Sequence, residues 1–302
     1  MKLLFSLILL TSSWSIVSSA QEAARTAGRS VFGENRYIEY IPGNLPLVIA
    51  SPHGGRERPE SMPDRVNGVT TADMNTQELA RAVSTEIQRR TARSPHLIIC
   101  RLHRVKLDPN REIQEAAQGH AIAEKAWHEH HAFISQACQK AVTEFGQAFL
   151  IDLHGHSHPA ARLELGYLHS VDDLKSPTAV LDAPLTAARG SLAALAKRSG
   201  LSYSELLRGP DSLGAYLEKQ GFLATPSPSL PIPAEPFFKG GYTTETHCLA
   251  EKKTIGLQIE APRPRLRDTA ENRKVFAVGL SEALDLFFKR HLGFGLDGKN
   301  HP

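Results

Sequence analysis

Short apolar runs set between helical segments constrain the fold of this chain more than any other feature of its sequence. The runs that we interpret as strands are Leu45–Ala50, Leu97–Arg101, Ala148–Leu153, Leu163–His169 and Thr254–Ile259. Runs of this kind are typical of a buried sheet covered by helices and not of an all-β domain. We therefore expect an α/β fold with a mixed, mostly parallel sheet and helices on both faces.

Helices are predicted where apolar residues recur at helical spacing. One stripe before the third strand comprises Trp127, His131, Ile134, Cys138, Ala141 and Phe145. The inward face of this helix therefore includes a histidine. The last helix is predicted to start at Asp268, with Glu271 completing a capping box, and to end near Gly293. The prolines from Pro226 to Pro236 predict a stiff extended loop.

The first twenty residues have the pattern of a secretory signal peptide. Lys2 precedes an apolar run, and the small residues Ser18, Ser19 and Ala20 form a cleavage site. Polar residues at positions 11–13 and 15 end the apolar run well short of the roughly 20 residues that cross a bilayer. We expect an exported protein, periplasmic, secreted or lumenal, without stable membrane insertion. The remaining chain is predicted to form one catalytic domain over residues 37–292.

Charge and cysteine content exclude several classes of protein. The formal net charge is +3 and the sequence has no basic cluster, which argues against nucleic acid as a partner. The three cysteines, Cys100, Cys138 and Cys248, are too widely spaced for a disulfide framework or a thiolate zinc site. One pair at most could form a disulfide. The sequence does not indicate an oligomeric state.

Two histidines follow two of the predicted strands. His53 comes directly after the first strand, in S-P-H-G-G, and His154 after the third, in D-L-H-G-H. Ligands of open α/β sheets bind outside the carboxyl ends of the strands, so the two imidazoles can meet over one site. A catalytic zinc commonly takes two histidines and a carboxylate and keeps one position open. The sequence therefore predicts one zinc ion per chain.

The acidic ligand has two candidates. Asp73 is predicted to open the helix Ala72–Thr91, and a helix start can project a side chain back toward the strand ends. Glu57 lies four residues after His53 and is the alternative. We prefer Asp73, although an Asp at a helix start can also be a plain cap.

Three further residues are expected to support the ligands without coordinating the metal: Asp152, Asp108 and His131. Asp152 lies two residues before His154, on the same face of the strand, where it can orient the imidazole. His131 lies on the apolar stripe, which favours a packed position. The cluster His154, His156 and His158 could also be a loop that binds metal adventitiously.

Two other segments supply polar groups at the same edge of the sheet. The segment R-V-K-L-D-P-N-R places Arg104, Asn110 and Arg111 after the second strand, and such side chains can hold a carboxylate. Glu260 ends an otherwise apolar strand, where an unpaired carboxylate is costly to bury, so a role in a site is favoured over a structural one. Together these segments contain the parts of a zinc hydrolase.

The order of these motifs resembles that of the N-formylglutamate amidohydrolase family, which is related in fold to zinc carboxypeptidases and aspartoacylases. The motifs are S-P-H-G-G, L-D-P-N-R, W-H-E-H-H, I-D-L-H-G-H, F-F-K-G-G-Y-T and L-Q-I-E. They extend from about His53 to Glu260. The chain departs from the family at Gly54, where the family usually has serine.

The resemblance implies a role for each matching residue. His53 and His154 would bind zinc, and Glu260 would act as the general base on the attacking water. Arg104 would polarise the scissile carbonyl, and Asn110 with Arg111 would hold the substrate's carboxylate. Gly240, Gly241 and Tyr242 would lie along the substrate pocket.

We therefore expect a zinc-dependent hydrolase that cleaves the amide bond of an N-acyl amino acid or of a short peptide with a free carboxylate. The alternatives are a secreted carboxypeptidase, a peptidoglycan-peptide amidase and a non-catalytic metal-binding relative. A binding module has no need for His53, His154 and Glu260 together, which argues against the last of these.

Overall fold

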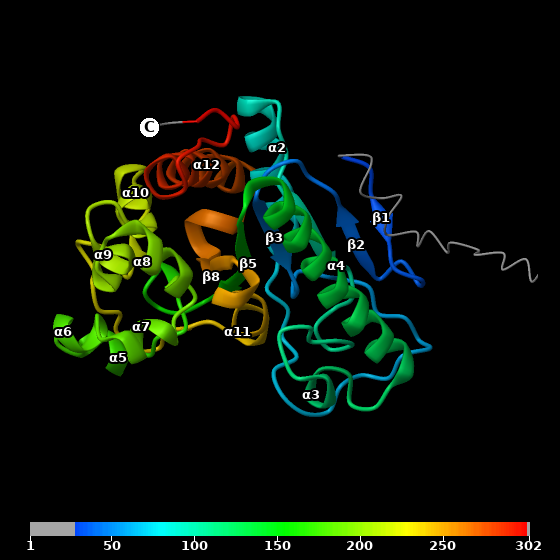
Figure 1. Cartoon of the computed structure of the whole chain (residues 1–302). Coiled ribbons are helices and arrows are strands. Elements are labelled where there is room, and N and C mark those ends of the chain that lie inside the picture. The colour runs from blue at the N-terminus through cyan, green and yellow to red at the C-terminus, as the bar shows by residue number, and fades with distance from the viewer. Residues whose placement is uncertain (1–27, 301–302) are drawn as a thin grey trace, which may run out of the picture.

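The computed structural model describes residues 28–300, in which eight strands form one sheet in the order β1-β2-β4-β3-β5-β8-β6-β7 (Figure 1). The strands are β1 (Val31–Phe32), β2 (Ile38–Ile41), β3 (Leu47–Ser51), β4 (His96–Cys100), β5 (Ala148–His156), β6 (Leu163–Gly166), β7 (Ala224–Thr225) and β8 (Thr254–Pro262). The pairs β4–β3, β3–β5, β5–β8 and β6–β7 are parallel, and the other three are antiparallel. The predicted mixed, mostly parallel α/β sheet is confirmed. The predicted signal peptide lies outside the described residues.

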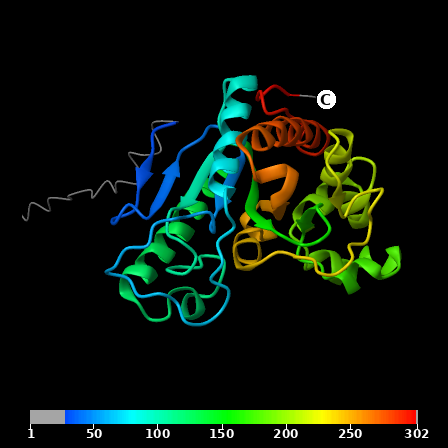
Figure 2. The same ribbon diagram turned by 180° about the vertical axis from the view of Figure 1, so that it is seen from behind.

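Helices cover both faces of the sheet. They are α2 (Thr76–Thr91), α3 (Ile113–Ala117), α4 (Ala121–Phe145), α5 (Val171–Lys175), α6 (Thr178–Leu181), α7 (Pro184–Ala188), α8 (Ala193–Ser199), α9 (Tyr203–Arg208), α10 (Leu213–Lys219), α11 (Tyr242–His247) and α12 (Ala270–Leu292), with the short segments η1 (Ala250–Lys252) and η2 (Arg263–Arg267). Helices α2 and α12 pack together, and α4 runs along the sheet separately from them (Figures 1 and 2). None of the helices in residues 28–300 combines the length and apolar character needed to cross a membrane.

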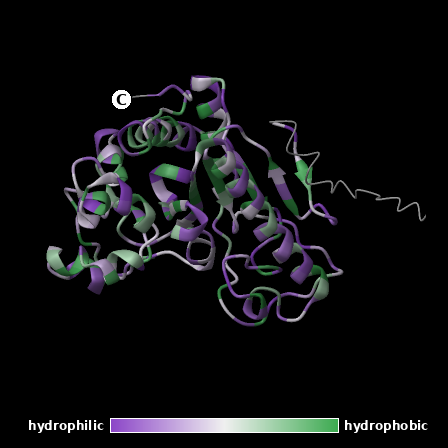
Figure 3. Ribbon diagram, in the orientation of Figure 1, coloured by the Kyte–Doolittle hydropathy of each residue, from purple (hydrophilic) through white to green (hydrophobic). Residues whose placement is uncertain are grey.

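Within the described residues, apolar side chains form two clusters, one on each face of the sheet. On β3, Ile49 joins the cluster under α2 and α12, and Val48 joins the cluster under α4. Both sets of alternate residues are apolar because both faces are covered. Figure 3 accordingly shows hydrophobic colour on the central strands. This explains why these strands appear in the sequence as continuous apolar runs.

The α4 face becomes polar toward the carboxyl ends of β5 and β8. Leu150 belongs to the core beneath α4, and the alternation of side chains then places Asp152 and His154 on the same face. The parallel register pairs Asp152 with Gln258 and His154 with Glu260. The sheet therefore delivers these side chains to one place.

Two predicted strand ends are wrong in a way that concerns the site. Strand β5 continues to His156 and β8 to Pro262, so His154 and Glu260 lie within strands and not beyond them. The backbone pairing of the two strands continues although the side chains turn polar. The predicted strand Leu163–His169 ends at Gly166, and the short strands β1, β2 and β7 were not predicted.

Both predicted helix starts also require correction. Helix α2 begins at Thr76, after Asn75 in a left-handed conformation, so Asp73 lies in the preceding loop. Helix α12 has Thr269 as its N-cap, because the Thr269 hydroxyl accepts a hydrogen bond from the Asn272 amide at 3.1 Å. The predicted capping box between Asp268 and Glu271 is absent from the described structure, while the predicted end at Gly293 is confirmed.

None of the three cysteines forms a disulfide in the described structure, and the predicted stripe of α4 is mostly buried. All three cysteines lie in the described part of the chain and are free, buried thiols, so no disulfide joins them. On α4, His131, Ile134, Cys138 and Ala141 are buried as predicted. Trp127 and Phe145 are only half-buried, since they lie near the two ends of the helix.

His96 on β4 makes acid stability a test of the fold. Its Nδ1 lies 2.8 Å from the Tyr40 hydroxyl and accepts the Gly43 amide at 3.1 Å, and burial lowers the pKa of His96 to about 3. The unfolded chain takes up this proton near its ordinary pKa of about 6.5, so stability is complete above that pH and falls as pH drops toward 3. We expect a loss of about 1.4 kcal/mol per pH unit from this residue. Unfolding free energies of the wild type and His96→Gln, measured from pH 4 to 8, should run parallel above about pH 6.5 and diverge by that slope below it. Curves that stay parallel down to pH 4 would contradict this.

Candidate metal centre and catalytic site

A cavity of about 150 Å³ lies at the carboxyl ends of β3, β5 and β8. Its walls come from six separate segments of the sequence. The lining residues are His53, Val69, Asp73, Arg104, Asn110, Arg111, His154, Gly155, Phe238, Gly240, Gly241, Gln258 and Glu260. The structure therefore brings most of the predicted site residues to one cavity.

Two histidines and one carboxylate converge in this cavity. The Nδ1 atoms of His53 and His154 lie 3.4 and 3.2 Å from Oδ2 of Asp73. All three donor atoms lie within 4.8 Å of one another, and His53 Nδ1 is buried without a hydrogen-bond partner among the described residues. Two imidazole nitrogens and a carboxylate oxygen that face one point could hold a divalent metal such as zinc.

The second nitrogen of each imidazole faces another carboxylate. His53 Nε2 lies 2.6 Å from Asp108 Oδ1, and His154 Nε2 lies 2.9 Å from Asp152 Oδ2. When His53 Nε2–H donates to Asp108, the lone pair on Nδ1 of His53 is directed to the centre, which is the tautomer that a metal ligand needs. Asp108 and Asp152 thus lie beside the ring nitrogens that face away from the centre.

The charge of this group also suits a cation. Burial opposes ionisation of Asp73, but the neighbouring imidazoles of His154 and His53 hold its pKa well below the usual range. Burial likewise opposes charge on His154, but Asp152 and Asp73 raise its pKa well above the ordinary value. The carboxylates around the two imidazoles therefore favour positive charge at this point.

The structure separates the two candidates for the acidic ligand. Glu57 lies at the surface and pairs with Arg101 at 2.5 Å. Asp73 is held beside the histidines because its amide donates to the His53 carbonyl at 3.0 Å. Gly54 permits this approach, since a Cβ there would lie 2.5 Å from the Thr76 hydroxyl at the start of α2. This contact explains why the usual serine of the family would not fit here.

The other histidines of the H-G-H-S-H segment are engaged elsewhere. His156 uses both ring nitrogens, one toward the Arg162 carbonyl at 2.8 Å and one as acceptor of the His158 amide at 3.0 Å. His158 Nδ1 lies 2.9 Å from Glu164 Oε1. His156, His158 and Glu164 are close enough to hold a metal, but coordination would cost His156 one of its hydrogen bonds. We therefore assign this cluster a structural role.

Glu260 has the features of a proton acceptor. Its Oε1 accepts a hydrogen bond from Gln258 at 2.9 Å, while its Oε2 is buried without a hydrogen-bond partner in the described chain. Burial raises the pKa of Glu260 to about 8; His154 opposes this shift and Asp73 contributes to it. A buried carboxylate that titrates near neutrality beside a cavity is typical of a general base.

Arg104 and Arg111 lie at the two ends of the segment 104–111, which was predicted to hold the substrate's carboxylate. Arg104 donates to Asp108 at 2.9 Å, and its guanidinium lies 3.6 Å from Asp73 Oδ1, beside the candidate metal ligands. Arg111 is about a third exposed and contacts Glu115 at 3.3 Å. Its Nη1 donates to the Asn110 carbonyl at 2.7 Å. Arg111 therefore retains donors for a ligand that enters the cavity.

Asn110 and Tyr242 have surroundings that differ from the predicted ones. The side chain of Asn110 donates to Gln258 at 3.2 Å and accepts the Thr243 amide at 2.8 Å, so it joins β8 to the start of α11. Gly241 packs directly on it, because a Cβ at Gly241 would lie 2.5 Å from Asn110 Nδ2. Tyr242 packs on Trp127 behind the cavity. Arg111 thus remains the better-placed group for a substrate carboxylate.

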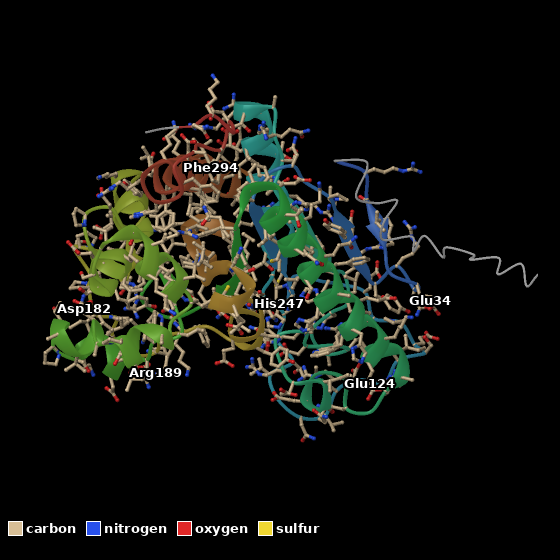
Figure 4. The ribbon with its side chains drawn as sticks, in the orientation of Figure 1. Glu34, Glu124, Asp182, Arg189, His247 and Phe294 are labelled. Atoms are coloured by element: carbon tan, nitrogen blue, oxygen red, sulfur yellow. The ribbon has the colours of Figure 1, made fainter. Side chains whose placement is uncertain are left out.

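A pair of neutral histidines holds the turn that carries Asp108. His131 donates from Nε2 to the Pro109 carbonyl at 2.9 Å, and its Nδ1 accepts from His247 Nε2 at 2.9 Å. Burial lowers the pKa of His131 to about 4 and that of His247 to about 3. Figure 4 labels His247 where α11 meets α4. His247 was not predicted, since a single histidine in a short helix carries no pattern, and Gln258 was missed although it lies two residues before Glu260.

Comparison with known proteins supports the fold assignment. No family model matches the sequence, and no curated protein matches it. Among solved structures, N-formylglutamate amidohydrolase from Ralstonia eutropha JMP134 is similar over 86% of this chain and 95% of that chain, with 16% identity and a TM-score of 0.51. A gene product from Agrobacterium tumefaciens (14% identity, 82% and 91% covered, TM-score 0.47) and a bacteriophage poly-gamma-glutamate hydrolase (14%, 87% and 91%, TM-score 0.37) are also similar.

The fold and site define an α/β protein whose His/Asp/His group could bind a metal. More specifically, the chain has the fold of the Ralstonia amidohydrolase. The resemblance noted in the sequence motifs is therefore confirmed at the level of the fold.

Proposed function

We propose that this protein is a zinc-dependent hydrolase of the amide bond in an N-acyl amino acid or a short peptide with a free carboxylate. The observation that carries the proposal is the convergence of His53, Asp73 and His154 beside Glu260 in one cavity. Each imidazole is backed by a carboxylate, and Glu260 keeps one oxygen free. A metal-binding protein without turnover would not need a buried carboxylate of raised pKa next to its ligands.

Each residue of the site has a separate role in the proposed reaction. His53, Asp73 and His154 would hold zinc, which when bound supplies Lewis-acid polarisation of the carbonyl and of the attacking water. Glu260 accepts a proton from the water as the new C–O bond forms, and passes it to the leaving nitrogen as the C–N bond breaks. The Arg104 guanidinium, beside Asp73, stabilises negative charge on the carbonyl oxygen.

The substrate's carboxylate is assigned to Arg111. Its guanidinium lines the cavity, and its contact with the half-exposed Glu115 can be exchanged for a contact with the substrate. A planar guanidinium binds a carboxylate with two parallel hydrogen bonds, which a lysine does not reproduce.

Replacing Arg111 with Ala should lower kcat/KM for substrates with a free α-carboxylate by about 30-fold, equivalent to roughly 2 kcal/mol, the lower end of the range for a charge pair because the arginine is partly exposed. Matched substrates with an amidated carboxylate should lose much less. Arg189→Ala, at the residue that follows α7 and outside the cavity, is the control. Equal losses on both kinds of substrate would show that Arg111 does not bind this carboxylate.

A panel of N-acyl amino acids, dipeptides and peptidoglycan stem peptides, assayed with zinc-loaded and chelated protein, tests the proposed activity. Preference for dipeptides would favour the carboxypeptidase alternative, and preference for peptidoglycan stem peptides the amidase alternative. The carboxypeptidase and the amidase would both require the metal, so chelation should abolish either activity.

A further inference from the structure

Two large apolar side chains are exposed at the edge of the polar cavity. Phe238, in the loop between β7 and α11, is 44% exposed, and Val69, in the loop before Asp73, is 50% exposed. Both line the cavity that contains Glu260. Apolar groups that remain exposed at a binding cavity indicate contact with an apolar ligand.

Phe238 is fixed in place by a buried carboxylate. Its amide donates to Glu164 Oε2 at 2.9 Å, and its ring stacks on the His158 ring, with centroids 4.9 Å apart and planes 23° apart. His158 in turn contacts Glu164 Oε1 at 2.9 Å. Arg162 donates to the Pro236 carbonyl at 3.2 Å and holds the same loop. The aromatic ring is therefore held in an exposed position instead of folding into the core.

The position of Phe238 determines which part of a substrate it can contact. Glu164 lies opposite Glu260 in the antiparallel register of β6 and β8, so the residue that holds Phe238 is the strand neighbour of the general base. Arg111 lies on a different segment and contacts Glu115 on α3. In the sheet, β4, which precedes the segment of Arg111, and β6, which holds Phe238 through Glu164, lie on opposite sides of β8. A substrate whose carboxylate binds Arg111 and whose scissile bond lies beside Glu260 would therefore extend its acyl end toward Phe238.

We propose that the substrate's acyl group is apolar and bulky, branched aliphatic or aromatic, and that it packs against Phe238. This inference rests on the proposed function and narrows it. A formyl group would leave the Phe238 ring exposed to water. Hydrolysis of such an amide adds the elements of water across the C–N bond and releases an apolar carboxylic acid and a free amino acid.

The test compares acyl groups on a single amino acid. The zinc-loaded protein is assayed on the N-formyl, N-acetyl, N-isovaleryl and N-benzoyl derivatives of the amino acid that it accepts best. We expect kcat/KM to be at least about tenfold higher for isovaleryl or benzoyl than for formyl, since each buried apolar group contributes a factor of roughly 10 or more. Phe238→Ala should reduce this ratio about tenfold, and Phe238→Leu should reduce it less. Leu185→Ala, an 86% exposed apolar residue on α7, is the control and should leave the ratio unchanged.

The outcomes separate this inference from the function on which it rests. If the wild type hydrolyses the formyl derivative as well as the bulky ones, or if Phe238→Ala keeps the wild-type ratio, the apolar acyl site is overturned and the hydrolase stands. If the zinc-loaded wild type hydrolyses no member of the series or of the wider panel, the proposed function fails and the inference fails with it. The wild-type ratio needs no variant, so the test remains decisive if Phe238→Ala does not fold.

Discussion

Replacing Glu260 with Gln should lower turnover by roughly two to four orders of magnitude, the usual contribution of a positioned general base. Glutamine keeps the size of the side chain and can still bond to Gln258, but it cannot accept a proton at the position of the free Oε2. Zinc content and thermal stability should therefore remain close to those of the wild type. Single-turnover rates, metal analysis and thermal unfolding, all on the same preparation, measure turnover, zinc content and stability.

The control for this variant is Glu57→Gln, which changes a carboxylate that pairs with Arg101 outside the cavity. It should keep both zinc and activity. Loss of zinc from Glu260→Gln would make Glu260 a metal ligand, and our assignment of three ligands would be wrong. Retention of zinc together with full activity would place the proton acceptor elsewhere.

Changing His53 or His154 to Ala should abolish stoichiometric zinc binding. A site with three protein ligands loses most of its affinity when one is removed, because a preformed set of donors supplies the binding free energy. Asp73→Ala should do the same, whereas Glu57→Ala should retain the metal. Zinc measured after dialysis against a weak chelator distinguishes these results.

Changing the carboxylates that contact the imidazoles should have a smaller effect on zinc affinity than changing the ligands. Asp108→Asn and Asp152→Asn should weaken zinc binding by about 10- to 100-fold without abolishing it, since outer partners orient the imidazoles and do not coordinate. If His53→Ala and His154→Ala both retain one zinc per chain, the metal site lies elsewhere. If Asp73→Ala retains it while Glu57→Ala loses it, the acidic ligand has been assigned to the wrong residue.

The sequence predicts the sheet and the meeting of His53 with His154 because parallel strands place their carboxyl ends at one edge. It fails at the ends of β5 and β8, where backbone pairing continues through His156 and Pro262 after the apolar pattern has stopped. It selects Asp73 from a predicted helix start that is wrong, since α2 begins three residues later. The aspartate reaches the histidines through its backbone hydrogen bond to His53, which no local pattern encodes.

The parts of the site that depend on contacts between distant segments could not be predicted. Asn110 is suited by type to holding a carboxylate, yet in the fold its amide joins Gln258 to Thr243. His247 contacts His131 across 116 positions of sequence. The exposed ring of Phe238 depends on Glu164, and only the structure shows that this carboxylate neighbours Glu260. Residue type indicates what a side chain can do, whereas its partners determine which of those roles remains available.

The most direct test of the central claim is the activity of one purified preparation, with measured zinc content, on the panel of N-acyl amino acids and dipeptides before and after removal of the metal. Our account predicts one zinc per chain, hydrolysis of at least one amide with a free carboxylate, loss of that activity on chelation and its return when zinc is added. Stoichiometric zinc with no hydrolysis of any member, or hydrolysis that survives complete removal of the metal, would contradict it.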